Sequence, residues 1–510
     1  MDPVEELFDV VVIGGGPVGE NAADRASRTG LTVALVEAEL VGGECSYWAC
    51  MPSKVLLRPG AVRALARDVP GLADPGAPDP AAVLAWRDEV THDWDDAGQV
   101  EWVEGAGLTL VRGHARLTGE RLVEVSLPDG DAAPGSGESP SAGAGQGTRL
   151  LRARHAVVAA TGSIPVLPDV PGIVGAEPWS SREATGVKDV PESLVVLGGG
   201  VVATEMATAF ADLGSRVTIL ARGGLLGAAE PFAGEAVAAS LREAGVDVRL
   251  GVEARSVERT ADGIVTVTHS GTDGGSDDTV TAAELLVATG RVPRTGDLGI
   301  DSVGLEPDGP LDVDESMQVR GVPGGWLYAC GDVTGRAPTT HQGKYQARVA
   351  GDVIAARYGS GGGEEAPTRG EEAPGVGQEA SRWTRYAATA DHVARTQVVF
   401  TRPQVAWVGF TEREAREAGL PVRAVSYDLS WVAGATVAGQ GYAGQAQVLV
   451  DTERRVLVGA TFVGPDAGEM LHAATIAIVG EVPLDRLWHA VPAYPTVSEV
   501  WLRFLESYGL

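Results

Sequence analysis

The segment GGECSYWACMPSK, residues 42–54, contains two of the chain's three cysteines, Cys45 and Cys50. Two thiols at this spacing can form a redox-active disulfide, supply half of a metal site, or be unrelated core residues. A structural zinc site normally needs four cysteine or histidine ligands at close spacing, so we expect no metal site. With so few cysteines, a chance pair at this spacing has a probability on the order of 1 in 100, which favours a functional pair.

The residues around the second cysteine predict a helix that would act on its thiol. Cys50 lies where the chain enters the pattern MPSKVLL, and Pro52 suits the first turn of a helix. A helix N-terminus favours a thiolate through its positive dipole end and its free N–H groups. Lys54, one turn after Cys50, would project from the same helix face.

Two stretches, 8–38 and 193–223, share one pattern and predict two βαβ units. Each has an apolar run suited to a buried parallel strand, a glycine turn, an alanine-rich helix and a second strand. In the first unit, Glu37 ends the second strand, where its carboxylate can accept hydrogen bonds from a ribose. The glycines that follow the first strand are Gly14, Gly16 and Gly19.

The second unit differs from the first at the residues that would select the nucleotide. It has Gly198, Gly200 and Ala203 in the glycine series, and its second strand ends in Ala221-Arg222. An arginine at this position suits a ribose 2′-phosphate, so we expect NADPH, with NADH as the alternative. Arg222 could instead be a solvated surface residue.

Length and charge limit the class of protein. A chain of 510 residues is too long for one core. Its 40 Lys and Arg against 69 Asp and Glu give a net charge of −29, which repels phosphate backbones and anionic membranes. We therefore expect no nucleic-acid and no membrane partner. The apolar runs fall short of the roughly 20 residues of a membrane span, and the acidic N-terminus lacks a signal-peptide pattern, which predicts a cytoplasmic protein.

Three segments rich in Gly, Pro, Ser and acidic residues are interpreted as loops or insertions. Their composition cannot offset the entropy of ordering a packed core. They are residues 128–147, 271–278 and 359–380. Strand and helix patterns begin again after the last of them, which predicts a separate α+β domain at 386–510.

Taken in order, the motifs resemble those of the pyridine nucleotide-disulfide oxidoreductases, the family of lipoamide dehydrogenase, glutathione reductase and mercuric reductase. Besides the first glycine series they are GGECSYWACMPSK for the family's GGTCxNxGCxPSK, ATG at 160–162, GGGVVATE at 198–205, ATGRVP at 288–293, YACGDVTG at 328–335, VVFTRPQVAWVG at 398–409 and YPTVSE at 494–499. The resemblance implies an α/β protein with two Rossmann-like domains, for FAD and for NAD(P)H, and a C-terminal α+β dimerisation domain. The expected boundaries are 1–190 for the first part of the FAD-binding domain, 191–295 for the NAD(P)H-binding domain, 296–385 for the second part of the FAD-binding or central domain, and 386–510 for the dimerisation domain.

The resemblance also implies roles for individual residues. Cys50 would face the flavin, Cys45 would meet the acceptor, and Lys54 would pair with Glu205 near the flavin ring. Cys330 is interpreted as a buried residue without chemistry. The FAD residues would be Gly14, Gly16, Gly19, Glu37, Gly43, Lys54, Ala115, Thr161, Gly162 and Asp332, and the NADPH residues would be Gly198, Gly200, Ala203, Glu205, Arg222 and Gly290.

The sequence departs from the family at the active-site base. The family has a histidine in H-P-T-x-x-E, supplied by the partner subunit, and Tyr494 stands there in this chain, although Glu499 is retained. A tyrosine with a pKa near 10 is only about one part in 1000 phenolate at pH 7, so it can donate a proton but hardly accept one. His489, close before it, is more simply a surface or helix-end residue.

The segment between the cysteines also departs from the family. Tyr47 and Trp48 replace Asn and a small residue, and Glu44 replaces a threonine that contacts the cofactor region in the family. The two rings could narrow access to the thiols, offer a stacking surface to a planar acceptor, or pack in the core of the FAD domain.

These observations predict a homodimeric, NADPH-dependent FAD enzyme that keeps the redox-active disulfide. Its small-molecule electron acceptor would need little base catalysis, as a quinone or an unusual disulfide would. Other functions stay open: a dihydrolipoamide dehydrogenase-like or low-molecular-weight disulfide reductase in which Tyr494 is the acid, or a redox sensor without turnover. A mercuric reductase is a weaker alternative, since no cysteine follows Cys330. Lys54 and Glu205 favour turnover.

Overall fold

The computed structural model describes residues 5–128, 147–360 and 383–510. The chain divides into two compact units, Met1–Met51 with Asp88–Ile164 and Arg291–Asp391, and Pro52–Arg87 with Pro165–Gly290 and His392–Leu510. Two of the predicted low-complexity insertions fall outside the described residues at 129–146 and 361–380. The third, 271–278, joins strands β12 (Val265–Gly271) and β13 (Asp278–Ala282) as predicted.

A seven-stranded sheet forms the centre of the first unit, in the order β3-β2-β1-β6-β5-β4, with β16 paired to β6. The pairs β1-β2, β1-β6, β2-β3 and β6-β16 are parallel, whereas β4-β5 and β5-β6 are antiparallel. The strands are β1 (Glu5–Ile13), β2 (Val33–Glu37), β3 (Thr109–Arg112), β4 (His114–Gly119), β5 (Leu122–Ser126), β6 (Thr148–Ala159) and β16 (Leu327–Ala329). The last four residues of β1 are all buried, as in a parallel strand covered on both faces.

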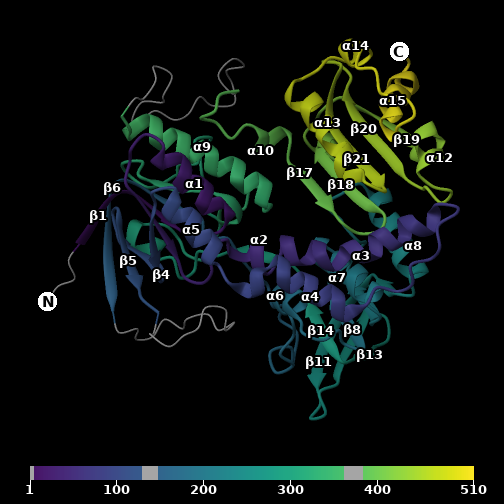
Figure 1. Cartoon of the computed structure of the whole chain (residues 1–510), viewed down its shortest axis with the longest axis horizontal. Helices are drawn as coiled ribbons and strands as arrows, with labels where there is room; N and C mark the ends of the chain where they lie inside the picture. The colour runs from purple at the N-terminus through teal and green to yellow at the C-terminus, as the bar shows by residue number, and fades with distance from the viewer. Residues whose placement is uncertain (1–4, 129–146, 361–382) are drawn as a thin grey trace. The chain divides into compact units, whose positions relative to one another are not determined.

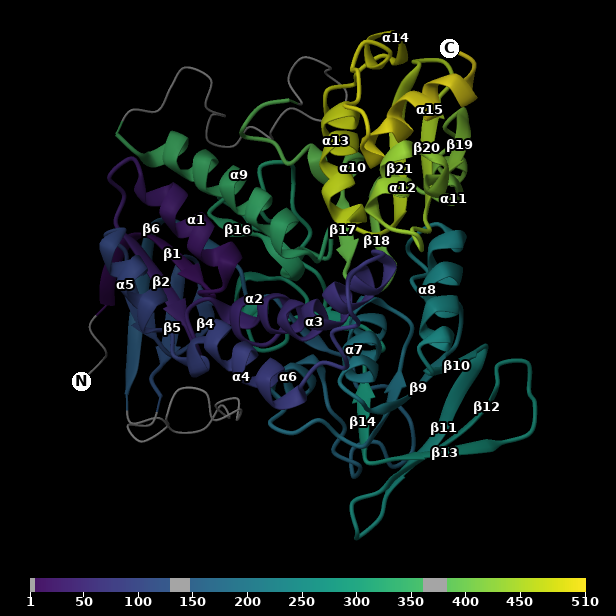
Figure 2. The same ribbon diagram turned by 45° about the vertical axis from the view of Figure 1, so that its right-hand side comes forward.

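Two helices, α1 (Pro17–Ser27) and α9 (Thr340–Tyr358), lie side by side over this sheet (Figures 1 and 2). A glycine makes their close approach possible. A Cβ added at Gly351 would stand 2.4 Å from Cβ of Arg25 and 3.0 Å from the carbonyl oxygen of Ala22. The other helices within this unit are α2 (Gly43–Tyr47), α5 (Ala97–Gly105), and the 3-10 turns η1 (His92–Trp94), η2 (Ile300–Val303) and η3 (Gly331–Thr334).

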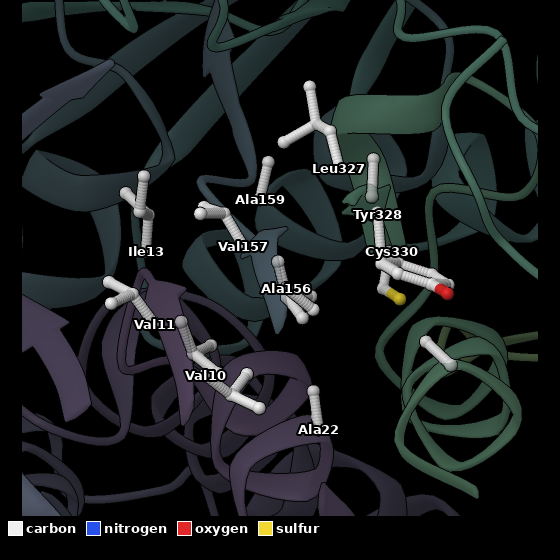
Figure 3. Packing of buried hydrophobic residues seen from close by; sticks show 14 of the residues in the cluster. Val10, Val11, Ile13, Ala22, Ala156, Val157, Ala159, Leu327, Tyr328 and Cys330 are labelled. Carbon is white, nitrogen blue, oxygen red and sulfur yellow. The ribbon is translucent and has the colours of Figure 1, made fainter. Parts of the chain in front are cut away.

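The core of the first unit is formed by side chains of β1, β6 and β16 with those of α1 and α9 (Figure 3). Cys330 directly follows β16 and is 1% exposed among them. Its burial raises the pKa of the Cys330 thiol well above the usual value, so the thiolate is disfavoured. Cys330 is therefore a packing residue, as the sequence predicts.

The second unit repeats the strand, turn and helix pattern around a parallel sheet in the order β10-β9-β8-β14. Its strands are β8 (Ser193–Leu197), β9 (Arg216–Ala221), β10 (Asp247–Leu250) and β14 (Glu284–Val287), with the helices α6 (Ser181–Gly186), α7 (Val201–Asp212) and α8 (Pro231–Glu243). A three-stranded antiparallel sheet contains β11 (Val252–Arg259), β12 and β13. The internal repeat predicted from the sequence is thus confirmed, with β8, α7 and β9 corresponding to β1, α1 and β2.

The C-terminal part of the second unit is a five-stranded antiparallel sheet in the order β17-β18-β21-β20-β19. Helix α13 (Ala467–Val479) lies on this sheet (Figure 2). The strands are β17 (Thr396–Val399), β18 (Gln404–Gly409), β19 (Val422–Asp428), β20 (Gln445–Asp451) and β21 (Val456–Gly464). The remaining helices are α11 (Glu412–Glu417), η4 (Leu429–Trp431), α12 (Ala433–Ala438), α14 (Leu484–Leu487), η5 (Val497–Glu499) and α15 (Val500–Tyr508).

Helix α3 (Cys50–Asp68) begins at the second cysteine, with Pro52 in its first turn as predicted, and the division between the units falls inside it. The other elements at such divisions are α4 (Pro80–Val90), α10 (Ala390–Val393) and the short strands β7 (Ser163–Pro165) and β15 (Arg291–Pro293). The predicted fold class is confirmed, with two Rossmann-like sheets and a C-terminal α+β domain. Among the described residues, no helix combines the length and the apolar character that a membrane crossing requires.

Candidate active site

The two cysteines of the opening motif meet at a threonine from a distant part of the chain. Cys45 lies in α2, and Cys50 is the first residue of α3. The Thr340 hydroxyl donates to Cys45 Sγ at 3.3 Å, and its oxygen lies 3.4 Å from Cys50 Sγ. Both cysteines are half-buried thiols in this structure. The spacing of the pair thus places both sulfurs around one oxygen atom.

The aromatic residues between the cysteines pack into the core. Tyr47 is 0% exposed and Trp48 is 7% exposed, in a cluster with Leu40. The Tyr47 hydroxyl donates to Gln99 Oε1 at 3.2 Å, and its burial raises the pKa of Tyr47 above the usual value. The possibility that the two rings form a stacking surface for a planar acceptor is therefore wrong. Core packing is favoured because burying each ring removes a large apolar area from water, which lowers the free energy of the folded protein.

The first glycine turn has the features of a dinucleotide cradle. Gly14 has φ +103°, and a Cβ there would stand 2.4 Å from the carbonyl oxygen of Ala160, so only glycine fits. No side chain caps α1 at Gly16, which leaves its first N–H groups available to an anion. Gly19 packs directly on the turn, because a Cβ there would stand 1.8 Å from the Gly14 oxygen. Gly43 lies against Gly16, since its Cβ would stand 2.8 Å from the Gly16 Cα.

Glu37 closes this cradle at the end of β2. Its Oε2 accepts from the Gly15 N–H at 2.6 Å, and its Oε1 accepts from the Glu39 N–H at 2.7 Å. Desolvation raises the pKa of Glu37, although these two N–H groups oppose the rise. The carboxylate is thereby fixed at the strand end, where a ribose hydroxyl is bound in Rossmann folds.

A second polar chain in the same unit joins Asp332 to Glu44. Asp332, in η3, accepts from the Ser163 hydroxyl at 2.6 Å, and Arg291 Nε donates to the same hydroxyl at 2.8 Å. Arg291 Nη2 also donates to Glu44 Oε2 at 2.6 Å. The acidic residue that departs from the family motif is therefore paired with an arginine. Sequence reasoning missed Ser163 and Arg291, although each directly follows an ATG motif.

The residues expected beside this chain are also fixed. The Thr161 hydroxyl donates to the Arg294 carbonyl at 2.7 Å, and the Arg294 N–H donates to the Gly162 carbonyl at 3.0 Å. Ala115 is buried in β4. The Gly331 N–H donates to Gln346 Oε1 at 2.7 Å, which ties the turn of Asp332 to α9. The sequence had no signal for Gln346, because a glutamine inside a helix pattern is ordinarily solvated.

Lys54 and Glu205 form an ion pair in the second unit. Lys54 Nζ donates to Glu205 Oε2 at 2.8 Å, and the Phe400 N–H donates to Glu205 Oε1 at 2.9 Å. Lys54 Nζ also lies 5.1 Å from the centre of the Phe400 ring. The Glu205 side chain is 3% exposed, so its charge is compensated by these two donors. Phe400 belongs to the motif VVFTRPQVAWVG, but its contact with the pair was not predicted.

The second glycine turn repeats the geometry of the first. Gly198 has φ +128°, and a Cβ there would stand 2.3 Å from the Ala288 carbonyl oxygen. No side chain caps α7 at Gly200, and Ala203 is fully buried in its first turn. Gly290 has φ +143°, and Arg222, directly after β9, is exposed. An exposed arginine is compatible both with a phosphate contact and with simple solvation.

Tyr494 and Glu499, the two residues predicted for the active-site base, differ in exposure. Tyr494 is 78% exposed, whereas Glu499 is 8% exposed. Glu499 Oε2 accepts from the Ala433 N–H at 3.2 Å, at the start of α12, and Glu499 Oε1 is paired with Arg503. The retained glutamate therefore supports α12 and α15 from inside the domain. His489 follows α14 and is exposed, as its surface interpretation predicts.

Comparison with known protein families gives two matches that follow one another along the chain. The model described as pyridine nucleotide-disulphide oxidoreductase matches residues 8–347, and the model described as the dimerisation domain of these proteins matches residues 396–503. The chain belongs to the pyridine nucleotide-disulphide oxidoreductases. It is thus a flavoprotein oxidoreductase with a dimerisation domain, as the resemblance implied.

Individual relatives in this oxidoreductase family carry two different activities in their names. A dihydrolipoyl dehydrogenase of Halobacterium salinarum is 32% identical over 511 residues, covering 98% of this chain and 95% of the relative. A mercuric reductase of Shigella flexneri is 31% identical over 502 residues, covering 96% of this chain and 79% of the relative. Among solved structures, the Cu(II) complex of the HOCl-induced flavoprotein disulfide reductase RclA from Escherichia coli has a TM-score of 0.76. It is 21% identical, with 98% of this chain and 99% of that chain covered, and so it supports the fold alone.

Family membership implies FAD and a nicotinamide cofactor, and the residues of this pyridine nucleotide-disulphide oxidoreductase fit both. Each glycine turn would clash with any Cβ at its first glycine, and each leads into a helix N-terminus that no side chain caps. Such a terminus suits a pyrophosphate. In the first unit, Glu37 would hold the ribose of FAD, and Asp332 with its Ser163 hydrogen bond would hold a further hydroxyl.

Proposed function

We propose that the protein is an NADPH-dependent FAD oxidoreductase with a redox-active Cys45–Cys50 disulfide. Its electrons would pass to a small-molecule acceptor that needs little base catalysis, a quinone or an unusual disulfide. The observation that carries this proposal is the contact of both sulfurs with the Thr340 hydroxyl, together with the position of Cys50 at the start of α3. A cytoplasmic location and a homodimer, with Tyr494 acting across the subunits, stay predictions.

The chain's own groups would act on the sulfurs. When bound, the flavin supplies the two-electron chemistry that links the nicotinamide to the disulfide. The disulfide takes up two electrons, the S–S bond breaks, one sulfur takes a proton, and the other stays a thiolate. Cys50 would be stabilised as a thiolate at the N-terminus of the 19-residue α3. Within the second unit, Glu205 would hold the Lys54 ammonium group in a fixed position.

The surroundings of Tyr494 support an acceptor with little need for a base. Within the described part of the chain, Glu499 is engaged by Arg503 and by the Ala433 N–H, and so it does not activate Tyr494. A phenol without a base is a poor proton acceptor at neutral pH. General acid-base catalysis is typically worth about 100- to 10,000-fold, so dithiol oxidation by small disulfides would lose roughly this factor. Hydride transfer to a quinone does not depend on the same base.

A disulfide reductase is the second candidate, because a relative at 32% identity is a dihydrolipoyl dehydrogenase. Tyr494 would then act as the proton donor to a leaving thiolate. The mercuric reductase relative supports a third function, the reduction of a soft metal ion as substrate. Against this function, the sequence has no cysteine after Cys330 that could deliver the metal. A sensor without turnover stays a further possibility that the same assays would test.

The proposal is tested by anaerobic titration of the FAD-loaded protein with NADPH and with NADH, followed by mixing with separate acceptors. The panel contains a benzoquinone, lipoamide, glutathione disulfide, Hg(II) and Cu(II). We expect NADPH to reduce the protein more readily than NADH, and the quinone to reoxidise it fastest. Faster turnover with lipoamide would instead support the second candidate. An absence of turnover with every acceptor would support the sensor.

Two substitutions separate the routes of electron exit. Cys45→Ala should leave quinone reduction largely intact, because the electrons need not pass through the disulfide. Tyr494→His restores the family's base and should raise disulfide reduction by at least tenfold if a disulfide site exists. Tyr494→Phe is the matched control, since it keeps the ring without a titrating group. A complete loss of quinone reduction in Cys45→Ala would contradict the proposed exit.

A further inference from the structure

One hydroxyl group lies between the two sulfurs of the reduced pair. Thr340 is the first residue of α9, and the N-terminal end of this helix lies close to α2 in both views (Figures 1 and 2). Its hydroxyl donates to Cys45 Sγ at 3.3 Å, and at its 3.4 Å contact with Cys50 Sγ either atom can be the donor. The threonine comes 290 residues after Cys50, so the fold and not the local sequence brings it to the thiols.

A hydroxyl is chemically suited to serve either sulfur. It has one proton to donate and two lone pairs that accept, and its hydrogen rotates freely about the C–O bond. When both sulfurs are thiols, it can donate to Cys45 while it accepts from Cys50. When one sulfur is a thiolate, the proton can turn toward that sulfur, and a hydrogen bond to an ionised acceptor is roughly twice as strong as a neutral one.

We propose that Thr340 is a positioning residue that stabilises the thiolate of the reduced Cys45–Cys50 pair. This inference rests on the proposed function, in which the pair is redox-active. On reduction, the disulfide takes two electrons from the reduced flavin, its S–S bond breaks, one sulfur takes a proton from solvent, and the other receives the Thr340 hydrogen bond. On reoxidation, the thiolate and the thiol reform the S–S bond, two electrons leave to the acceptor or the flavin, and one proton is released.

The neighbouring threonine provides a matched control. Thr339 is the N-cap residue of α9, but its side chain caps no N–H group. Its hydroxyl lies 3.1 Å from His341 Nε2, whereas the hydroxyl of Thr340 lies at the sulfurs. The two residues are therefore of the same type and lie at the same helix terminus. They differ in which atom the hydroxyl contacts, so only the loss of the Thr340 hydroxyl should change the thiols.

The test measures thiol reactivity in the full-length FAD-loaded protein and needs no turnover. The protein is reduced with dithiothreitol, freed of the reagent without oxygen, and alkylated briefly with iodoacetamide between about pH 5 and pH 9, where thiols titrate. Mass spectrometry then gives the rate at Cys45 and at Cys50 separately. The variants are Thr340→Val, Thr340→Ala, Thr340→Ser and Thr339→Val, each with its melting temperature recorded.

We expect Thr340→Val and Thr340→Ala to raise the apparent pKa of the more reactive thiol by about one unit, which lowers its alkylation rate about tenfold at pH values below the pKa of the native thiol. Thr340→Ser should restore the rate because it keeps the hydroxyl, and Thr339→Val should match the native protein. Equal rates in Thr340→Ala, Thr339→Val and the native protein would overturn the inference. If Thr340→Val melts far below the native protein, the comparison of Thr340→Ala with Thr340→Ser decides.

A separate measurement distinguishes this inference from the proposed function. The native protein and all variants are equilibrated with oxidised dithiothreitol, and the Cys45–Cys50 disulfide is quantified by mass spectrometry. If the disulfide forms but alkylation is independent of Thr340, the inference fails and the proposed function stands. If the native protein forms no such disulfide, the proposed function fails, and the inference fails with it.

Discussion

The Lys54–Glu205 pair is unequal, because the Lys54 side chain is 34% exposed and the Glu205 side chain is 3% exposed. Removing the lysine would leave the buried Glu205 carboxylate with the hydrogen bond from the Phe400 N–H but without its cationic partner. An uncompensated buried charge is costly, whereas a neutral amide of the same shape can accept the same N–H. The energetic importance of the lysine therefore depends on the charge of the glutamate.

We predict that Lys54→Met lowers the free energy of unfolding by about 2 kcal/mol, less than for a fully buried pair because Lys54 is partly exposed. Glu205→Gln should be milder, and the double variant Lys54→Met/Glu205→Gln should recover most of the loss. Urea unfolding of the four proteins measures this cycle. Losses that simply add in the double variant would show that the two side chains are not coupled.

Residue-level prediction from the sequence succeeded where a motif carries the residue and failed where only the fold brings it in. Cys45 and Cys50 were recognised as a pair, and the resemblance pointed to the contact of Lys54 with Glu205. Thr340 and Arg291 were missed, because they lie 290 residues from Cys50 and 247 residues from Glu44. Thr340 follows a pattern that does not differ from an ordinary helix start, and the ATGRVP motif that contains Arg291 does not indicate which residue the arginine contacts.

At the scale of elements, the two βαβ units use their first and second glycines for different purposes. Gly198 has φ +128°, and its Cβ position lies 2.3 Å from the Ala288 carbonyl oxygen. Gly200 has φ −83°, and nothing lies within 4 Å of its Cβ position. Backbone geometry therefore requires glycine at the first position. The second position is open, as expected where a pyrophosphate approaches the backbone.

We predict that Gly198→Ala lowers the free energy of unfolding by at least about 2 kcal/mol, since the left-handed backbone and the carbonyl clash both oppose a side chain. Gly200→Ala is the matched control and should change stability by less than about 0.5 kcal/mol. It should nevertheless weaken NADPH binding, because the methyl group would occupy the path of the phosphates. Thermal melts without nucleotide and a fluorescence titration with NADPH measure the two effects. Equal stability of the two variants would contradict this division of roles.

The elements that could be predicted were those with a clear period and a boundary residue. The strands and helices of both glycine units follow from apolar runs that end in glycine, and the start of α3 follows from Cys50 and Pro52. The position of Tyr47 and Trp48 could not be predicted. Their five-residue helix α2 is too short for a hydrophobic period, so the sequence left core packing and exposure equally open.

At the scale of the whole molecule, family and fold class were predictable because motifs occur in order along nearly the entire chain. The division inside α3 was not, because one continuous helix carries no signal of composition where the units separate. The function of Glu499 was also hidden. The glutamate of its motif is retained in the sequence, but its carboxylate is paired with Arg503 and accepts from the Ala433 N–H of α12.

The C-terminal domain exposes apolar side chains that a homodimer would bury. Trp431, Val437, Val491 and Tyr494 are 71%, 73%, 84% and 78% exposed. Helix α12, which carries Val437, packs against the turn after Tyr494, because a Cβ at Gly434 would stand 2.1 Å from the Thr496 carbonyl carbon. Large exposed apolar groups in one region mark an interaction surface, and homodimer interfaces are richer in such groups than ordinary surface.

We predict that the native protein elutes with twice the mass of one chain in size-exclusion chromatography with light scattering, and that Trp431→Glu shifts it toward the monomer. A buried, unpaired carboxylate would oppose association, whereas in the monomer it is solvated. Trp86→Glu is the control, since Trp86 is 41% exposed in α4 and outside the C-terminal domain. If Trp431→Glu stays dimeric while its melting temperature is unchanged, the interface lies elsewhere. Tyr494 would then not reach a partner through this surface.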